Sequence, residues 1–171
     1  MKRFGDAPSR AEFKERTDLR RQDMRDRAEE MEDPVDDMET LTGVEEGLSG
    51  ESSAEVVEFI EGEVEEAKDD SSDTFDREAR ELEEVQSETD EDVTELDERS
   101  DATSDDAEKL KMAGDLLHGD RAKEAADRSS DESLREAEFL AELASETHAD
   151  VEENRQVEED NRRRLDQARR R

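Results

Sequence analysis

The side chains that could do chemistry in this sequence are two histidines and a large excess of carboxylates. His118 and His148 are the only histidines, and there is no cysteine. Acid–base catalysis needs carboxylates whose pKa values are driven apart, usually by burial. Nucleophilic catalysis needs an activated serine or cysteine, and no serine lies in a Gly-x-Ser-x-Gly turn. We therefore expect no catalytic residue, no cofactor and no small-molecule substrate.

The spacings typical of metal sites are incomplete. A di-iron helical bundle takes ligands from Glu-x-x-His pairs on facing helices. The nearest match here is Asp115-x-x-His118, whereas Ser145 stands three residues before His148. The acidic run 90–101 lacks the glycine that gives a calcium-binding loop its sharp turn. We predict no dedicated metal site and expect both histidines to be surface residues.

The composition favours helices with thin apolar seams over a globular interior. Of 171 residues, 29% are hydrophobic and 49% are charged, and Trp and Tyr are absent. These apolar residues are too few to fill a core several layers thick. A net charge of −32 with low hydropathy is also typical of intrinsic disorder. A sustained helical periodicity argues for order instead.

That periodicity consists of small and apolar residues at alternating steps of three and four. A period near 3.5 is typical of helices that pack on one another in a coiled coil. It predicts an all-α fold with long helices, either an elongated antiparallel helical hairpin or a three-helix coiled-coil bundle. The expected helix-packing seam comprises Met24, Met31, Val35, Met38, Ile60, Val64, Phe75, Leu82, Val93, Leu96, Leu110, Leu117, Leu140, Val151 and Leu165.

Local composition divides the chain into five segments. Proline lacks the backbone donor and clashes with the preceding turn, so Pro34 should bend the first helix or divide it into two. The sequence leaves open whether the later helices break near Asp70, Gly119 and Ser130. The predicted segments are a flexible basic N-terminus over 1–8, a first helix over 9–42 with its kink near Pro34, a linker of Gly, Ser and Glu over 43–53, a long acidic helix over 54–103, and one or more return helices over 104–171 with a basic C-terminal end.

Charge is distributed very unevenly along the chain. Residues 28–106 hold 34 acidic and four basic side chains, whereas 1–27 and 155–171 are each net positive by three. Excess carboxylates with few lysines keep a protein hydrated in concentrated salt, where screening over about 3 Å at 1 M removes self-repulsion. We interpret the pattern as halophilic. The alternative is an acidic coiled coil from a mesophile with a GC-rich genome.

The basic ends are candidate contacts for phosphates or for an acidic partner. The alternative is that their arginines pair with carboxylates one helical turn away and complement the helix dipole. No aromatic residue lies between the C-terminal arginines to stack on bases. The candidate contact residues are Arg20, Arg21, Arg162, Arg163, Arg164, Arg169, Arg170 and Arg171.

Together these features predict a non-enzymatic structural or assembly protein, a scaffold or spacer. It would serve in a multi-subunit particle such as a virion. We expect protein partners, in a homo-oligomer or larger assembly, with the stripe Met24, Met31, Val35 and Met38 as one candidate surface for self-association. Two alternatives stay open: an acidic regulator that mimics nucleic acid and binds a basic partner, and an adaptor that binds nucleic acid through the basic ends.

The sequence also bears on location. No apolar run approaches the roughly 20 residues of a transmembrane helix, and the first six residues lack the apolar stretch of a signal peptide. We expect no membrane span, and a protein that resides in the cytoplasm or within a particle assembled there.

Overall fold

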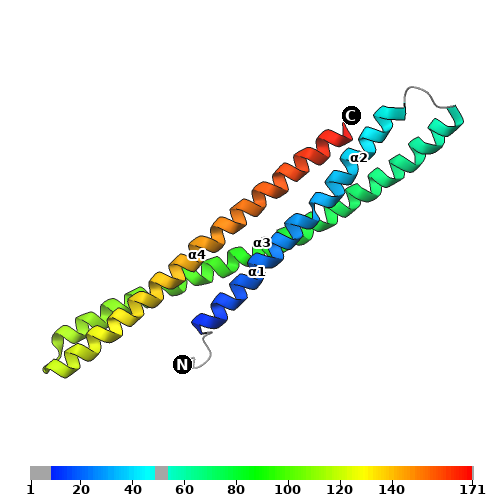
Figure 1. The fold of residues 1–171 in the computed structure, drawn as a ribbon. Helices are drawn as coiled ribbons and strands as arrows, with labels where there is room; N and C mark the ends of the chain where they lie inside the picture. Colours follow the sequence, from blue (N-terminus) through cyan, green and yellow to red (C-terminus); the bar gives the residue numbers. More distant parts are fainter. Residues whose placement is uncertain (1–8, 49–53, 171) are drawn as a thin grey trace. The chain divides into compact units, whose positions relative to one another are not determined.

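The protein is almost entirely helical. The computed structural model describes residues 9–48 and 54–170, and no β-strand occurs within these ranges. The all-α prediction is therefore confirmed. The predicted flexible N-terminus, the second half of the predicted linker and Arg171 lie outside the described residues. The helices are α1 (Arg10–Glu30), α2 (Glu32–Leu48), α3 (Ala54–Leu116) and α4 (Asp120–Arg169) (Figure 1).

The helices contribute to two compact units, each with an apolar core of its own. Unit 1 contains the residues up to Asp18 together with Glu88–Asp150, and unit 2 contains Leu19–Ser87 together with the residues from Val151 onward. The core of unit 1 takes side chains from α1, α3 and α4, and the core of unit 2 takes side chains from α1, α2, α3 and α4. Beyond the core of unit 1, α3 and α4 continue as a two-helix hairpin.

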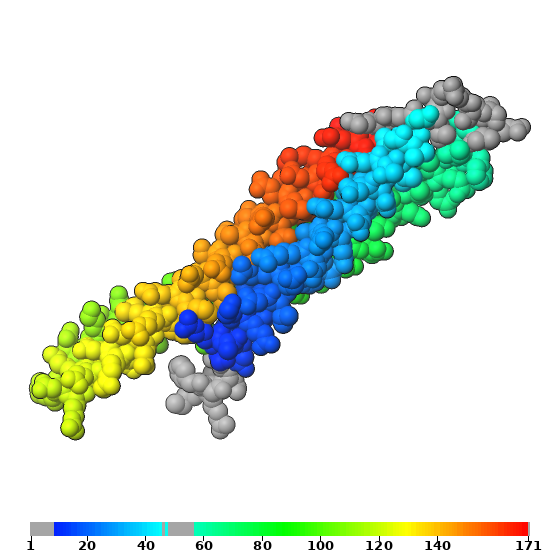
Figure 2. Space-filling model, in the orientation of Figure 1, coloured from blue at the N-terminus to red at the C-terminus, as the bar shows by residue number. Residues whose placement is uncertain are grey.

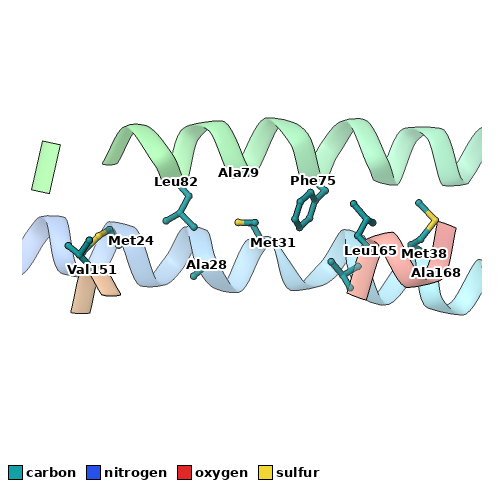
Figure 3. Packing of buried hydrophobic residues seen from close by; sticks show 11 residues of the cluster. Met24, Ala28, Met31, Met38, Phe75, Ala79, Leu82, Val151, Leu165 and Ala168 are labelled. Atoms are coloured by element: carbon teal, nitrogen blue, oxygen red, sulfur yellow. The ribbon is translucent and has the colours of Figure 1, made fainter. Parts of the chain in front are cut away.

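The core of unit 2 is a single cluster of side chains that follow the predicted 3.5-residue period. Figure 3 shows these side chains lying between the helices that contribute them. Sulfur and aliphatic side chains predominate, with one phenylalanine. The members are Met24, Ala28, Met31, Val35 and Met38 from α1 and α2, Phe75, Ala79 and Leu82 from α3, and Val151, Leu165 and Ala168 from α4.

Ion pairs in unit 2 show that α3 runs antiparallel to α1 and α2. Arg27 pairs with Glu81, and Lys68 pairs with Glu45. Residue numbers therefore fall along α3 as they rise along α1 and α2. Charged side chains at the edge of an apolar seam set the pairing of helices in coiled coils, and these pairs do the same here.

Contacts between α2 and α4 show that these two helices run parallel within unit 2. The Arg164 guanidinium pairs with the Asp36 carboxylate at 2.7 Å. Further along both helices, the Thr42 hydroxyl donates a hydrogen bond to the Ala168 carbonyl at 3.3 Å. Residue numbers thus rise together along the two helices.

Of the two outcomes expected at Pro34, one bent helix or two helices, the structure has two helices, α1 and α2, separated by Met31. Pro34 lies in the first turn of α2, where backbone amides have no helical acceptor, so the missing donor costs little there. The break lies three residues before the predicted kink for this reason. The Met31 amide still donates to the Arg27 carbonyl at 3.1 Å, and the apolar stripe keeps its spacing across the break.

The predicted linker over 43–53 begins too early. Helix α2 continues through Gly43 and Gly47 to Leu48. A glycine costs a helix interior about 1 kcal/mol relative to alanine. The buried Thr42 on the packed face of the same helix shows why that cost is tolerated, because tertiary packing outweighs local propensity.

The predicted boundary between the long acidic helix and the return helices, after residue 103, is also wrong. Helix α3 runs 63 residues to Leu116 without a break at Asp70. The chain reverses at Gly119, whose positive φ of 134° is a conformation that side-chain-bearing residues rarely adopt. Helix α4 then continues through Ser130. Of the three breaks that the sequence left open, only the one at Gly119 occurs.

Candidate functional site

The structure places most of the predicted packing seam inside the two cores. Ile60, Val93 and Leu110 are half-buried. Leu117 is 44% exposed, and its assignment to the seam was wrong because α3 ends one residue before it. The buried members are Met24, Met31, Val35, Met38, Val64, Phe75, Leu82, Leu96, Leu140, Val151 and Leu165.

The stripe proposed for self-association is not available for that purpose. Met24, Met31, Val35 and Met38 are at most 1% exposed, and all four belong to the core of unit 2. The prediction was wrong because a heptad stripe looks the same whether its partner helix belongs to the same chain or to another. Any contact between copies must use other residues.

The two-helix hairpin of unit 1 has a seam of small residues. Ser100, Ala107 and Gly114 recur every seven residues along α3, and Ala107 and Gly114 are buried. The Ser100 hydroxyl donates to the Ala137 carbonyl, and the Ser130 hydroxyl donates to the Ala107 carbonyl, both at 2.9 Å. Small side chains let the helices approach closely enough for these hydrogen bonds to cross between them.

Gly114 is needed because α4 lies against it. A Cβ atom at this position would come within 2.9 Å of the Ala126 Cβ, whereas nothing lies within 4 Å of a Cβ at Gly62. We expect Gly62→Ala to stabilise the fold by about 0.5–1 kcal/mol through helix propensity. Gly114→Ala should destabilise it by about 1 kcal/mol, because overpacking outweighs the same gain. Urea unfolding followed by circular dichroism measures both.

The double variant Gly114→Ala/Ala126→Gly isolates the contact. Removing the Ala126 methyl relieves the clash, so the double variant should be destabilised less than the sum of the two single variants. Equal stabilisation by Gly114→Ala and Gly62→Ala would show that the helices do not approach each other here as the structure has them.

The arginines near the C-terminus lie among carboxylates. Arg162 pairs with Glu158 at 3.0 Å, and the Arg164 guanidinium is held by Asp36 at 2.7 Å and Glu39 at 2.9 Å. Hydrogen bonds that Arg164 donates to these two carboxylates raise its pKa above the usual value. These two arginines are therefore paired within α4 and across to α2, and a contact with phosphates through them stays a prediction.

The other basic candidates are placed differently. Arg20 and Arg21 are half-buried on α1, whereas Arg169 and Arg170 are exposed at the end of α4. Arg163 pairs with Glu159 at 2.8 Å and with Asp160 at 3.1 Å. A contact with phosphates or an acidic partner through these residues stays a prediction.

In unit 1, arginines hold α1 against the other two helices, an arrangement that the sequence analysis missed. Phe13 is buried, and the Arg99 and Arg16 guanidinium carbons lie 4.6 and 5.0 Å from its ring centre. Arg16 also pairs with the buried Asp92 at 3.1 Å. Cation–π contacts with a ring are stronger where the cation is partly desolvated. The sequence signal for this arrangement was Arg16, which lies three residues after Phe13, the only aromatic residue of α1.

Buried polar side chains interrupt the apolar seam of unit 2. Gln86, Asn154 and Asn161 are buried, so this end of α4 packs rather than frays, and the side-chain amides can specify helix register. Burial, together with the nearby Glu83 carboxylate, raises the pKa of Glu158, while the Arg162 guanidinium opposes that rise.

The raised pKa makes the effect of Glu158 depend on pH. Its stabilising contribution is fully present below the pKa of the unfolded chain and is lost as pH rises through the folded pKa. At pH 7, Glu158→Gln should therefore stabilise the fold, by about 0.5 kcal/mol because the lost Arg162 pair offsets part of the gain. The difference from wild type should vanish near pH 4.

Urea unfolding at pH 4 and pH 7 tests this expectation. Glu159→Gln on the same helix turn is the matched control, since the Glu159 side chain is 65% exposed. A difference for Glu158→Gln that is the same at both pH values would mean that burial of its carboxylate has no energetic effect.

The hollows on the two units are not lined by a recognisable set of catalytic or metal-binding side chains. One of about 510 Å³ lies beside Pro34 in unit 2, and another of about 470 Å³ lies beside His148 in unit 1. Both histidines are exposed. Within 9–48 and 54–170, no three His, Cys, Asp or Glu side chains come together in a way that could hold a metal ion. The carboxylates that line the first hollow are Glu30, Asp33, Asp37, Asp70 and Glu78.

Comparison with known proteins provides no relative from which to infer function. No family model matches the chain, and no curated protein or solved structure is significantly similar to it. In the part of the chain that the structure describes, every helix is too short or too polar to cross a membrane.

Proposed function

We propose that this chain is a non-enzymatic coiled-coil protein with a structural role, a scaffold or spacer in an assembly. The observation that carries the proposal is how the apolar residues are used. Most of the large ones that the structure describes lie in thin seams between helices, while charged residues occupy most of the remaining helix surface. Helices of 63 and 50 residues are held in register in this way.

Contacts between helices, at the edges of the seams and in the hairpin, support a mechanical role for the protein. Ion pairs such as Arg27 with Glu81 and Arg164 with Glu39 join helices that are distant in sequence. In the hairpin, the hydroxyls of Ser100 and Ser130 bond directly to carbonyls of the facing helix. Each such contact opposes sliding of one helix along another, which a spacer must resist.

We propose further that the protein is halophilic and acts in the cytoplasm or in a particle assembled there, such as a virion. The charge of −32 on 171 residues supports this proposal. Carboxylates retain water where salt competes for it, and concentrated salt screens their mutual repulsion. Few lysines are available to offset that charge.

Small-angle scattering with light scattering, on the full chain at about 2 M KCl, tests the structural role. A compact domain of this length has a radius of gyration of about 16 Å. Light scattering gives the mass and therefore the number of copies in the particle. For that number of copies, a spacer should have a radius of gyration at least half as large again as a compact particle. A compact monomer near 16 Å would contradict the proposal.

A further inference from the structure

The turn between α3 and α4 differs in charge from the acidic segments on either side of it. Residues 107–128, which we call the hairpin tip, hold five basic and five acidic side chains. Residues 28–106 hold 34 acidic and four basic side chains. Two copies of so acidic a chain repel each other along most of their surfaces, so a neutral surface is where a second copy can approach at least electrostatic cost.

The hairpin tip also exposes large apolar side chains. Met112 is 63% exposed, Leu116 is 79% exposed, and Leu117 follows directly. Met112 and Leu116 are four residues apart and therefore lie on the same face of α3. All eleven residues from 115 to 125 are exposed, and Figure 2 shows this yellow-green end without a covering segment in that view.

The third helical segment of unit 1 does not reach these side chains. Phe13 of α1 packs with Leu96 of α3 and with Leu140 and Leu143 of α4. No residue of the hairpin tip belongs to that cluster. Single exposed apolar residues, such as Leu19, are ordinary on protein surfaces, but adjacent ones that form a patch mark an interaction site.

We propose that the hairpin tip is a self-association surface at which two copies of this chain pack tip to tip about a two-fold axis. In a two-fold contact the same patch meets itself, so it must be self-complementary. The tip meets this requirement. Its apolar side chains can cover one another, and lysines such as Lys109 and Lys111 can face carboxylates such as Asp120 and Glu124 of the second copy.

This inference rests on the proposed assembly role and names the contact for it. We expect a contact made by a few side chains at the end of a hairpin to bury less than the roughly 800 Å² per partner of a standard stable interface. We therefore expect a dissociation constant in the range of about 10–100 μM. Association should strengthen with KCl, because salt screens the repulsion between the acidic bodies while the apolar contact persists.

Sedimentation equilibrium of the full chain at about 2 M KCl tests the contact. Met112→Glu/Leu116→Glu should weaken dimerisation at least tenfold, because four carboxylates would then meet at the apolar patch. The matched control is Leu19→Glu, at a residue that is 66% exposed outside the tip, and it should dimerise like wild type. Circular dichroism would verify that all three proteins are equally helical.

Because the chain contains no cysteine, one introduced thiol reports the geometry directly. Mild oxidation of Leu117→Cys should give a covalent dimer, whereas Leu19→Cys should stay mainly monomeric. A monomeric wild type, or an unaffected Glu double variant, would overturn the tip contact. The scattering result would then still decide the structural role separately, and a tip dimer of compact subunits would overturn that role alone.

Discussion

Lowering KCl from about 2 M to about 0.1 M should cost this protein most of its helicity. Residues 28–106 include all of α2 and most of α3, and they carry 34 acidic against four basic side chains. The screening length is about 10 Å at 0.1 M salt and below 3 Å at 2 M. At low salt, neighbouring turns and facing helices therefore repel one another.

The thin cores cannot offset that repulsion. In unit 2 the cluster has eleven buried side chains, three of which are alanines. Folded domains of this size are stable by only about 5–15 kcal/mol, so a self-repulsion of comparable size is enough to unfold them. Helicity measured by circular dichroism across a KCl series should rise steeply below about 1 M, where screening changes most.

Two controls identify the cause. Sucrose strengthens apolar burial without screening charge, so it should restore less helicity at low salt than KCl does. Glu61→Gln/Glu65→Gln/Glu66→Gln removes three exposed charges from α3 and should move the folding midpoint to lower KCl. Identical melting temperatures at both salt concentrations would contradict both the repulsion and the halophilic interpretation.

Phe75→Ala should destabilise unit 2 by about 3–5 kcal/mol. Phe75 is 1% exposed and is the only aromatic residue of that core, where Figure 3 shows it between α3 and its neighbours. Truncation removes the transfer free energy of the ring and leaves a cavity that the helices can close only in part. A core this thin has few other side chains to compensate.

The chain offers a matched control on the same helix. Phe59 is 69% exposed, so Phe59→Ala should change the stability by less than about 0.5 kcal/mol. Urea unfolding in about 2 M KCl measures both variants. A loss of similar size for the two would mean that Phe75 is not enclosed as the structure places it. Phe75→Leu, which retains most of the volume, should fall between them.

Much of the fold can be predicted from the sequence because one signal repeats many times. A spacing of three and four recurs from Val64 through Leu96 and again from Leu140 through Leu165, and each repetition supports the same helical face. The three successive steps of four from Ala67 to Ala79 could have broken the helix. They do not, since Phe75 and Ala79 are both buried against other helices.

The sequence could not show where packing between helices prevails over a local signal for a helix end. Ser104 and Asp105 are good helix caps, yet the chain passes them within α3 because Ala107 and Gly114 still have α4 beside them. Nor does a stripe such as Met24 to Met38 reveal its partner. Both outcomes depend on which distant segment of the chain packs against the helix. The residues that are neighbours in the sequence do not contain that information.

The net charge of the chain also determines what any assembly of this protein must contain. The arginines near the carboxyl end pair with carboxylates of their own chain, and the net charge with every arginine counted is −32. Electroneutrality then requires 32 monovalent cations for every copy. Packing many copies into a closed compartment would therefore concentrate potassium or sodium inside it, and that ion excess would exert an osmotic pressure on the enclosing wall.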